Sequence, residues 1–229
     1  MSAQAPGRVT SRAAIGVALL SSAYVAAQLL ADVSSLRLVD LMGRAIDGGT
    51  FIYPITFTLR DLVHKVAGKQ VARALIVAAA AINVFMAGFF WMVARLPLVA
   101  DSGPQSELFG DVLGPVWRIV IASIIAEVIS ELIDTEVYSA WVRRFGGSNQ
   151  WGRVLASNAV ALPVDSVLFA LIAFSGIGPL EAVVPATVVW EIIYLNVLFK
   201  GVVTIASMPL IYAVKPQSVV TERDASGRS

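Results

Sequence analysis

Long apolar segments, interrupted by isolated polar residues, make up most of this 229-residue chain. A helix needs about 20 residues to cross a bilayer. Five apolar runs approach or exceed that length: residues 13–31, 74–94, 112–133, 154–174 and 186–214. A sixth run, residues 51–66, is shorter and carries more polar groups. The pattern predicts an all-α integral membrane protein with six transmembrane helices, the second of them short or broken.

The second apolar run admits two interpretations. Gly48 and Gly49 permit unusual backbone conformations before it, and Pro54 removes a backbone donor inside it. Arg60 and Asp61 then follow at a depth where charge must be sheltered. One interpretation is a broken or partly re-entrant segment that lines a cavity, as transporters often contain. The other is a short helix whose charged end reaches the cytoplasm.

The composition agrees with a membrane protein and removes several function classes. Hydrophobic residues make up 57% of the chain and charged residues only 14%, whereas soluble domains have about 25% charged residues. With no cysteine and one histidine, His64, the chain cannot form disulfides, thiolate metal sites or a multi-histidine metal site. The net charge of +1 is dispersed, which indicates no nucleic-acid partner. We therefore expect no metal and no cofactor.

The distribution of Lys and Arg predicts the orientation in the membrane. We expect one transmembrane transporter domain over residues 1–215, with a retained first helix rather than a cleaved signal, and a disordered cytoplasmic tail over residues 216–229. With the N-terminus inside, the outer segments carry three basic residues: Arg37, Arg44 and Arg95. The inner segments then carry eleven of the 17: Arg8, Arg12, Lys65, Lys69, Arg73, Arg143, Arg144, Arg153, Lys215, Arg223 and Arg228. Because basic residues favour the cytoplasmic side, both termini are predicted to be cytoplasmic.

Carboxylates inside the apolar runs are the first indication of function. An ionised side chain at a helix centre costs roughly 2.5–3.5 kcal/mol on insertion scales, so each must face a polar environment. Glu127, Glu131 and Asp134 are spaced at i, i+4 and i+7 and fall on one helical face, with Ser130 beside them. This stripe predicts a polar cavity between helices, although Asp134 is also close enough to the helix end to be a solvated interfacial charge.

The last two runs add further polar positions. Asn158 and Asp165 share a helical face, and Pro163 between them can kink the helix and expose backbone carbonyls. Glu191 and Lys200 lie in the final run, on nearly opposite faces. Lys200 is predicted to pair with a carboxylate of another helix, with contact to substrate as the alternative. For Arg118, near the outer surface, an ordinary role as an interfacial anchor is an equally good interpretation.

The candidate substrate-binding residues are the polar groups that these runs place within the membrane. They are Asp61, Glu127, Ser130, Glu131, Asp134, Asn158, Asp165, Glu191 and Lys200. A catalytic alternative lacks support, because the sequence has no nucleophile elbow and its only histidine lies at the edge of the short run. Two other classes stay open. One is a channel or carrier for another small metabolite; the other is a substrate-binding subunit that borrows an ATPase module, since the chain has no P-loop.

Four motifs in order resemble the YhhQ family of queuosine precursor transporters, also called the vitamin uptake transporter (VUT) family. They are DGGTFIYPITF at residues 47–57, RDLVHKVAGKQVAR at 60–73, RIVIASIIAEVISELID at 118–134 and RVLASNAVALPVDSVLFALIAFSG at 153–176. The lysine-containing last run ending in MPLIY follows the family pattern as well. The resemblance covers residues 13–213. The chain departs from the family at Lys65, where glutamate is usual, and at Glu131, where glutamine is common.

The resemblance implies a function and a substrate class. Members import 7-deazaguanine bases such as preQ0 or preQ1, and Asp61, Arg118, Ser130, Asp134, Asp165 and Lys200 match the family. The chemistry of the candidate residues agrees with this substrate. A guanine-like edge presents an N–H and an exocyclic amine side by side, and one carboxylate can accept both hydrogen bonds. The expected partners are thus a small purine-like molecule and lipid, in a bacterial inner membrane.

Overall fold

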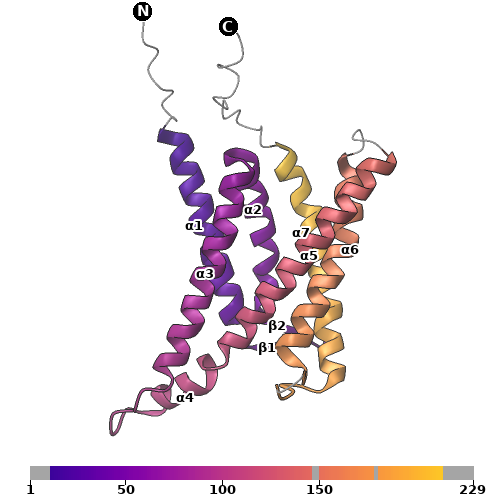
Figure 1. The fold of residues 1–229 in the computed structure, drawn as a ribbon. Helices are drawn as coiled ribbons and strands as arrows, with labels where there is room; N and C mark the ends of the chain where they lie inside the picture. Colours follow the sequence, from indigo (N-terminus) through magenta and orange to yellow (C-terminus); the bar gives the residue numbers. More distant parts are fainter. Residues whose placement is uncertain (1–10, 146–149, 178–179, 214–229) are drawn as a thin grey trace, which may run out of the picture.

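Seven α-helices and one small β-hairpin make up the part of the chain described by the computed structural model, which covers residues 11–145, 150–177 and 180–213 (Figure 1). A short 3-10 helix, η1 (Gly48–Phe51), follows the hairpin. The hairpin strands are β1 (Leu38–Leu41) and β2 (Arg44–Asp47). The helices are α1 (Ser11–Ser34), α2 (Tyr53–Ala67), α3 (Lys69–Val93), α4 (Pro104–Leu113), α5 (Val116–Phe145), α6 (Gln150–Phe174) and α7 (Ala186–Ala213).

Five segments in the described residues are long and apolar enough to cross a membrane: Ala14–Ser34, Gln70–Val93, Pro104–Asp134, Leu155–Phe174 and Ala186–Ala206. This confirms a multi-pass helical membrane protein. Helix α2 has 15 residues and does not reach the length of about 20 that spans a bilayer. The predicted count of six spans therefore stays a prediction. Residues 214–229, the predicted tail, lie outside the described residues.

The chain is not purely α-helical, because a hairpin that the sequence analysis did not predict follows α1. Strands β1 and β2 pair antiparallel, with Leu38 opposite Asp47 and Leu41 opposite Arg44. The two turn residues, Met42 and Gly43, both have positive φ, at 56° and 80°, as a tight type I′ turn requires. The Asp40 carboxylate accepts a 2.9 Å hydrogen bond from the Gly43 backbone N–H. Each strand has only four residues, which is too short for periodicity to identify.

Two glycines allow the segment after the hairpin to pack against the end of α1. A Cβ atom at Gly49 would lie 2.5 Å from the Ala31 carbonyl oxygen, and one at Gly48 would lie 2.7 Å from the Ser34 carbonyl oxygen. Both distances are too short for any side chain. Helix α2 then begins at Tyr53 with Pro54 in its first turn, where the missing N–H leaves no helical bond unmade. Pro54 thus starts the helix rather than breaking it.

Helix α5 begins later than predicted and extends further. The predicted run 112–133 is divided at Gly114 and Pro115, because residues 104–113 form the separate helix α4. Arg118, in the first turn of α5, is buried within the protein. Its guanidinium donates to the backbone carbonyls of Ile172 and Glu181 at 2.8 and 2.7 Å, and also to that of Ser175. The bonds to Ile172 and Ser175 satisfy carbonyl groups at the C-terminal end of α6. The bond to Glu181 ties the segment between α6 and α7 to α5.

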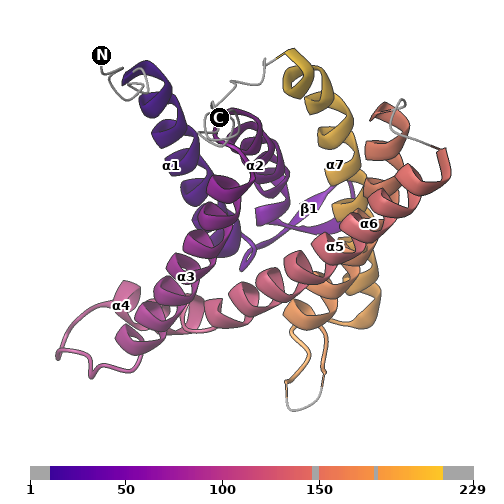
Figure 2. The same cartoon turned by 45° about the horizontal axis from the view of Figure 1, so that its top comes forward.

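Apolar packing forms two main groups of helices, which a smaller cluster of Ala87 on α3 with Val116 and Val120 on α5 joins. Tyr24, Val63, Leu75 and their neighbours pack α1, α2 and α3 together. Ile119, Phe174, Ile192 and their neighbours pack α5, α6 and α7 together, and side chains of the hairpin lie against this second cluster. Figure 2 shows the hairpin lying between the two groups. In Figure 1 the first turn of α1, the α2–α3 junction and the last turn of α7 lie at one end of the bundle.

Candidate functional site

A small polar cavity lies where α1, η1, α2, α5, α6 and α7 meet. Its volume is about 20 Å³, enough for a water molecule and far too little for a bicyclic ring. Most of the polar residues that line the cavity are buried, and small residues from α1, η1 and α5 complete the lining. The lining residues are Ala31, Asp32, Ser35, Asp47, Gly49, Thr50, Tyr53, Ser123, Ala126, Asp165, Phe169, Asn196 and Lys200.

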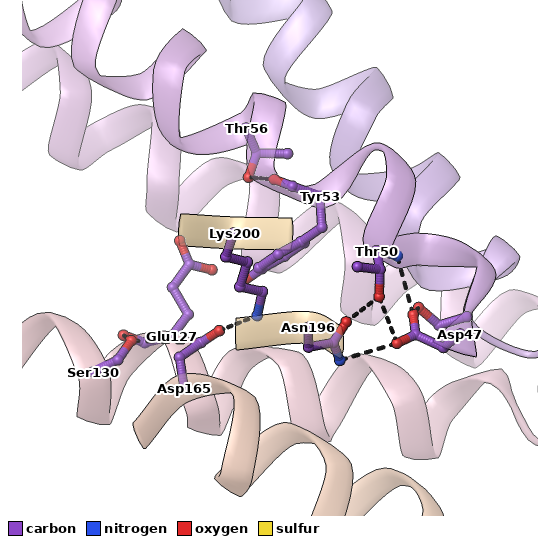
Figure 3. Close-up of polar contacts among 10 residues, drawn as sticks. Asp47, Thr50, Tyr53, Thr56, Glu127, Ser130, Asp165, Asn196 and Lys200 are labelled. Atoms are coloured by element: carbon purple, nitrogen blue, oxygen red, sulfur yellow. Dashed lines mark hydrogen bonds and ion pairs between the residues drawn. The ribbon is translucent and has the colours of Figure 1, made fainter. Parts of the chain in front are cut away.

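A buried ion pair forms one side of the cavity. The Lys200 ammonium on α7 donates to the Asp165 Oδ2 on α6, and the two residues are 3% and 2% exposed. The ammonium also lies 4.7 Å from the centre of the Tyr53 ring, which places Tyr53 beside the pair (Figure 3). Ser130 donates to the other carboxylate oxygen, Oδ1, at 3.4 Å. The predicted pairing of Lys200 with a carboxylate of another helix is confirmed.

A fully hydrogen-bonded carboxylate, Asp47, forms the opposite side. It ends β2 and accepts hydrogen bonds from Ser35 Oγ at 2.8 Å, from the Thr50 N–H and hydroxyl at 3.2 and 2.8 Å, and from Asn196 Nδ2 at 3.0 Å. The Thr50 hydroxyl also lies within hydrogen-bond reach of the Asn196 side-chain oxygen, which is a second acceptor for its one hydrogen (Figure 3). These bonds hold the hairpin against α1 and α7. Since four donors satisfy the Asp47 carboxylate, its role in the site is structural.

A second buried carboxylate, Asp32, is not satisfied in the same way. It lies on α1, is 2% exposed and lines the cavity. The Ser123 hydroxyl, which also lines the cavity, lies beside this carboxylate as a neutral donor. Its Oδ2 has no hydrogen-bond partner among the described residues. Because buried polar atoms are nearly always paired, an unpaired carboxylate oxygen in a cavity wall marks a place for a donor.

A separate group of charged residues, Arg60, Asp61 and Glu131, forms what we call the Arg60 cluster. The Arg60 guanidinium pairs with the Glu131 carboxylate and lies 3.4 Å from Asp61 Oδ1. The side chains of Arg60, Asp61 and Glu131 are 21%, 43% and 39% exposed, respectively. One helical turn before Glu131, Glu127 accepts a 3.4 Å hydrogen bond from the Tyr24 hydroxyl, which itself accepts from Gln28.

The structure brings together only part of the predicted site. Two of the nine candidates, Asp165 and Lys200, line the cavity, and Ser130 contacts Asp165 from behind. The wall from α5 consists of Ser123 and Ala126 rather than the predicted carboxylate stripe. Asp61, Glu127, Glu131, Asp134 and Asn158 do not line it. Asp134 and Asn158 are half-buried, and helix α6 runs through Pro163 without ending.

Glu191 supports the hairpin instead of the cavity. Its carboxylate accepts a 2.8 Å hydrogen bond from the backbone N–H of Ala45 in β2. That N–H belongs to a two-stranded sheet, so without Glu191 an edge donor would need another partner. Glu191 is therefore a positioning residue for the segment that carries Asp47.

Asp32, Asp47, Thr50, Tyr53 and Asn196 line the cavity but were absent from the predicted site. The predicted first span ended at residue 31, one position before Asp32. Yet Tyr24, Gln28 and Asp32 recur every four residues and so share a face of α1, which was a usable signal. Asp47 comes three residues before Thr50, the spacing at which an aspartate caps the start of a helix. The structure shows this cap, because the Asp47 side chain accepts a hydrogen bond from the Thr50 N–H at the start of η1.

The fold and the cavity together define a class of protein. Helices long enough to cross a membrane enclose buried acids, a lysine, amides and hydroxyls at their centre, an arrangement typical of membrane transport proteins. Among the described residues, no group of three or more His, Asp or Glu could hold a metal ion. The chemistry available in the cavity is hydrogen bonding and charge pairing with a small polar molecule.

Comparison with known proteins identifies the family. The profile of the family described as "Putative vitamin uptake transporter" matches residues 47–214, and the chain belongs to this family. The chain is also similar to a protein of Bacillus subtilis (strain 168) named "Probable queuosine precursor transporter", with 27% identity over 202 residues, covering 87% of this chain and 84% of the relative. No solved structure matches the chain.

Proposed function

We propose that this protein imports a queuosine precursor, a 7-deazaguanine base such as preQ0 or preQ1, across the bacterial inner membrane. The observation that carries the proposal is the buried polar cavity at the centre of the helices of an uptake-transporter family. The name of the Bacillus subtilis relative supplies the substrate class. No cofactor has a role in the proposal.

The cavity residues suit such a substrate in three ways. The Asp32 and Asp165 carboxylates are acceptors for the N–H groups of a guanine-like edge. Asn196, Thr50 and Ser123 offer a side-chain amide and hydroxyls. Tyr53 and Phe169 supply aromatic surface for a planar ring. The Asp165–Lys200 pair lies in the middle of this set and is the proposed centre of the substrate site.

Transport requires the cavity to enlarge, because about 20 Å³ does not hold a heterocyclic base. The two groups of helices, each with its own apolar core and joined by the smaller α3–α5 cluster, are the units that would move against each other. The polar residues of the cavity come from both groups: Asp32 and Tyr53 from one, Asp165 and Lys200 from the other. A base bound between them would contact both groups and couple their separation to its own binding.

The proposed orientation places both termini in the cytoplasm. The first turn of α1, the α2–α3 junction and the last turn of α7 lie at one end of the bundle, and the end of α3 lies at the other (Figure 1). Lys65 and Arg73 flank the α2–α3 junction in sequence, whereas Arg95 follows the end of α3. This arrangement supports the orientation expected from the excess of basic residues on the cytoplasmic side. Reporter fusions at residue 105 and at the C-terminus would then report opposite sides.

Uptake in cells tests the proposed function. A host that cannot make or import queuosine precursors is given the wild-type chain and labelled preQ1 or preQ0, and label in tRNA is measured. We expect labelled queuosine in tRNA only when the chain is present. Label no higher than in cells with the empty vector, with the protein present in the membrane, would reject the proposal.

A second candidate follows from the family description, which names vitamin uptake. The same cavity would then serve another small planar or vitamin-like metabolite, with the chain acting either alone or as the binding subunit of an ATPase-driven complex. Competition of labelled preQ1 uptake by unlabelled vitamins separates the substrates. Uptake in a host that lacks any vitamin-transport ATPase separates a self-sufficient carrier from a subunit.

A further inference from the structure

Asp32 differs from every other carboxylate in the cavity wall. Asp47 accepts four hydrogen bonds and Asp165 is paired with Lys200 and Ser130. Asp32 is as deeply buried, at 2% exposure, but its Oδ2 has no hydrogen-bond partner among the described residues. A buried carboxylate oxygen without a donor is unfavourable in the empty protein and becomes favourable when a ligand supplies the donor.

Among the described residues, no basic side chain forms an ion pair with Asp32. Lys200 is the one basic residue in the cavity lining, and its ammonium is paired with Asp165. The Ser123 side chain, which also lines the cavity, offers Asp32 a neutral hydroxyl and no charge. An ionised carboxylate can accept about four hydrogen bonds. Most of the acceptor positions of Asp32 are therefore open to the N–H groups of a ligand.

From this geometry we infer that Asp32 determines specificity by accepting two hydrogen bonds from the donor edge of the substrate, its ring N–H and exocyclic amine. The inference rests on the proposed function and names the recognition element within that site. The two carboxylate oxygens match two parallel N–H donors in one plane. Ala31 and Ala126, which also line the cavity, have small side chains, and Tyr53 contributes a ring on which the base can stack.

The substitution Asp32→Asn is the sharpest test, because it replaces one acceptor oxygen by a donor and keeps the shape. Labelled preQ1 uptake is competed with 7-deazaguanine and with 7-deazahypoxanthine, which lacks the exocyclic amine. The wild type should prefer 7-deazaguanine by about tenfold or more, the scale of one bidentate contact with a base edge. In Asp32→Asn the ratio of the two inhibition constants should fall to near one. Asp32→Glu, which keeps both acceptors, should retain part of the preference.

Asp47→Asn is the matched control. It changes a carboxylate of equal burial in the same wall, but one whose acceptors are already used by the protein. We expect fewer folded molecules and an unchanged ratio of inhibition constants. A ratio that falls equally in Asp47→Asn and Asp32→Asn would overturn the inference, because a general disturbance of the cavity would then explain both.

The outcomes separate failure of the inference from failure of the proposed function. If the wild type takes up preQ1 and Asp32→Asn keeps the wild-type ratio, Asp32 is not the specificity residue and the proposed function stands. If the wild type takes up neither preQ1 nor preQ0, both are rejected. Where uptake by Asp32→Asn is too slow to compete, the same ratio is taken from ligand-induced shifts in thermal unfolding of the purified proteins. A wild-type preference in that assay also overturns the inference.

Discussion

The cavity and the Arg60 cluster both place charged groups within the helical bundle, yet they differ in exposure and in pairing. Asp165 and Lys200 have side chains only 2% and 4% exposed, whereas those of Arg60, Glu131 and Asp61 are 21%, 39% and 43% exposed. Burial of an ion pair is expensive, and hydrophobic residues of the same volume are often as stable. The comparison teaches that burial and unsatisfied acceptors, rather than the number of charges, distinguish a candidate binding site from a stabilising cluster.

The largest effect is expected from the buried pair. The single substitution Asp165→Asn leaves the Lys200 ammonium buried without a counter-charge and should destabilise the protein by about 3–5 kcal/mol. The double variant Asp165→Asn, Lys200→Gln removes both charges while keeping two hydrogen-bonding side chains. We expect it to unfold at a temperature near that of the wild type but to lose uptake. Thermal unfolding in detergent and uptake in cells measure the two effects; wild-type uptake by the double variant would make the pair purely structural.

An intermediate effect is expected from Asp47. Asp47 Oδ2 accepts hydrogen bonds from the Thr50 hydroxyl and the Asn196 amide. In Asp47→Asn one carboxylate oxygen becomes an NH₂ group, so a donor faces the donors that the oxygen had accepted from. Leaving buried donors without acceptors costs about 1–3 kcal/mol. The melting temperature should fall, while uptake per folded molecule should fall much less. Uptake normalised to the amount of folded protein in the membrane is the measurement. Complete loss of uptake in a variant that is fully folded would assign Asp47 to the substrate site.

The smallest effect is expected from the Arg60 cluster. Half-exposed ion pairs contribute about 0–1 kcal/mol, so Asp61→Asn should change the unfolding temperature little and preserve uptake. Arg60→Gln should be slightly worse, since it releases both Glu131 and Asp61. Uptake and melting curves of the two variants are the measurement. Loss of uptake in stable Asp61→Asn would extend the substrate site along α2, as the sequence alone suggested.

Hydrophobic pattern alone located the long helices, because membrane insertion demands long apolar runs. Predicted run 186–214 and helix α7 (Ala186–Ala213) begin at the same residue. The hairpin and α4 were missed because four- and ten-residue elements leave no clear period. Lys200 was correctly paired with a carboxylate, since a buried ammonium needs one. The partner of Lys200 could not be chosen among six acids without knowing which helices touch. Asp32, one residue beyond the predicted first run, was not among those acids.

The position of the substrate is the central claim, and cysteine protection tests it most directly because the chain contains no cysteine. Ala126→Cys places one thiol in the cavity wall, and His64→Cys places one at an exposed position of α2 outside the cavity lining. Labelling by a small thiol reagent is timed with and without saturating preQ1. We predict that preQ1 slows the labelling of Ala126→Cys and leaves that of His64→Cys unchanged. Equal labelling rates of Ala126→Cys in the presence and absence of preQ1, in protein that transports it, would contradict the account.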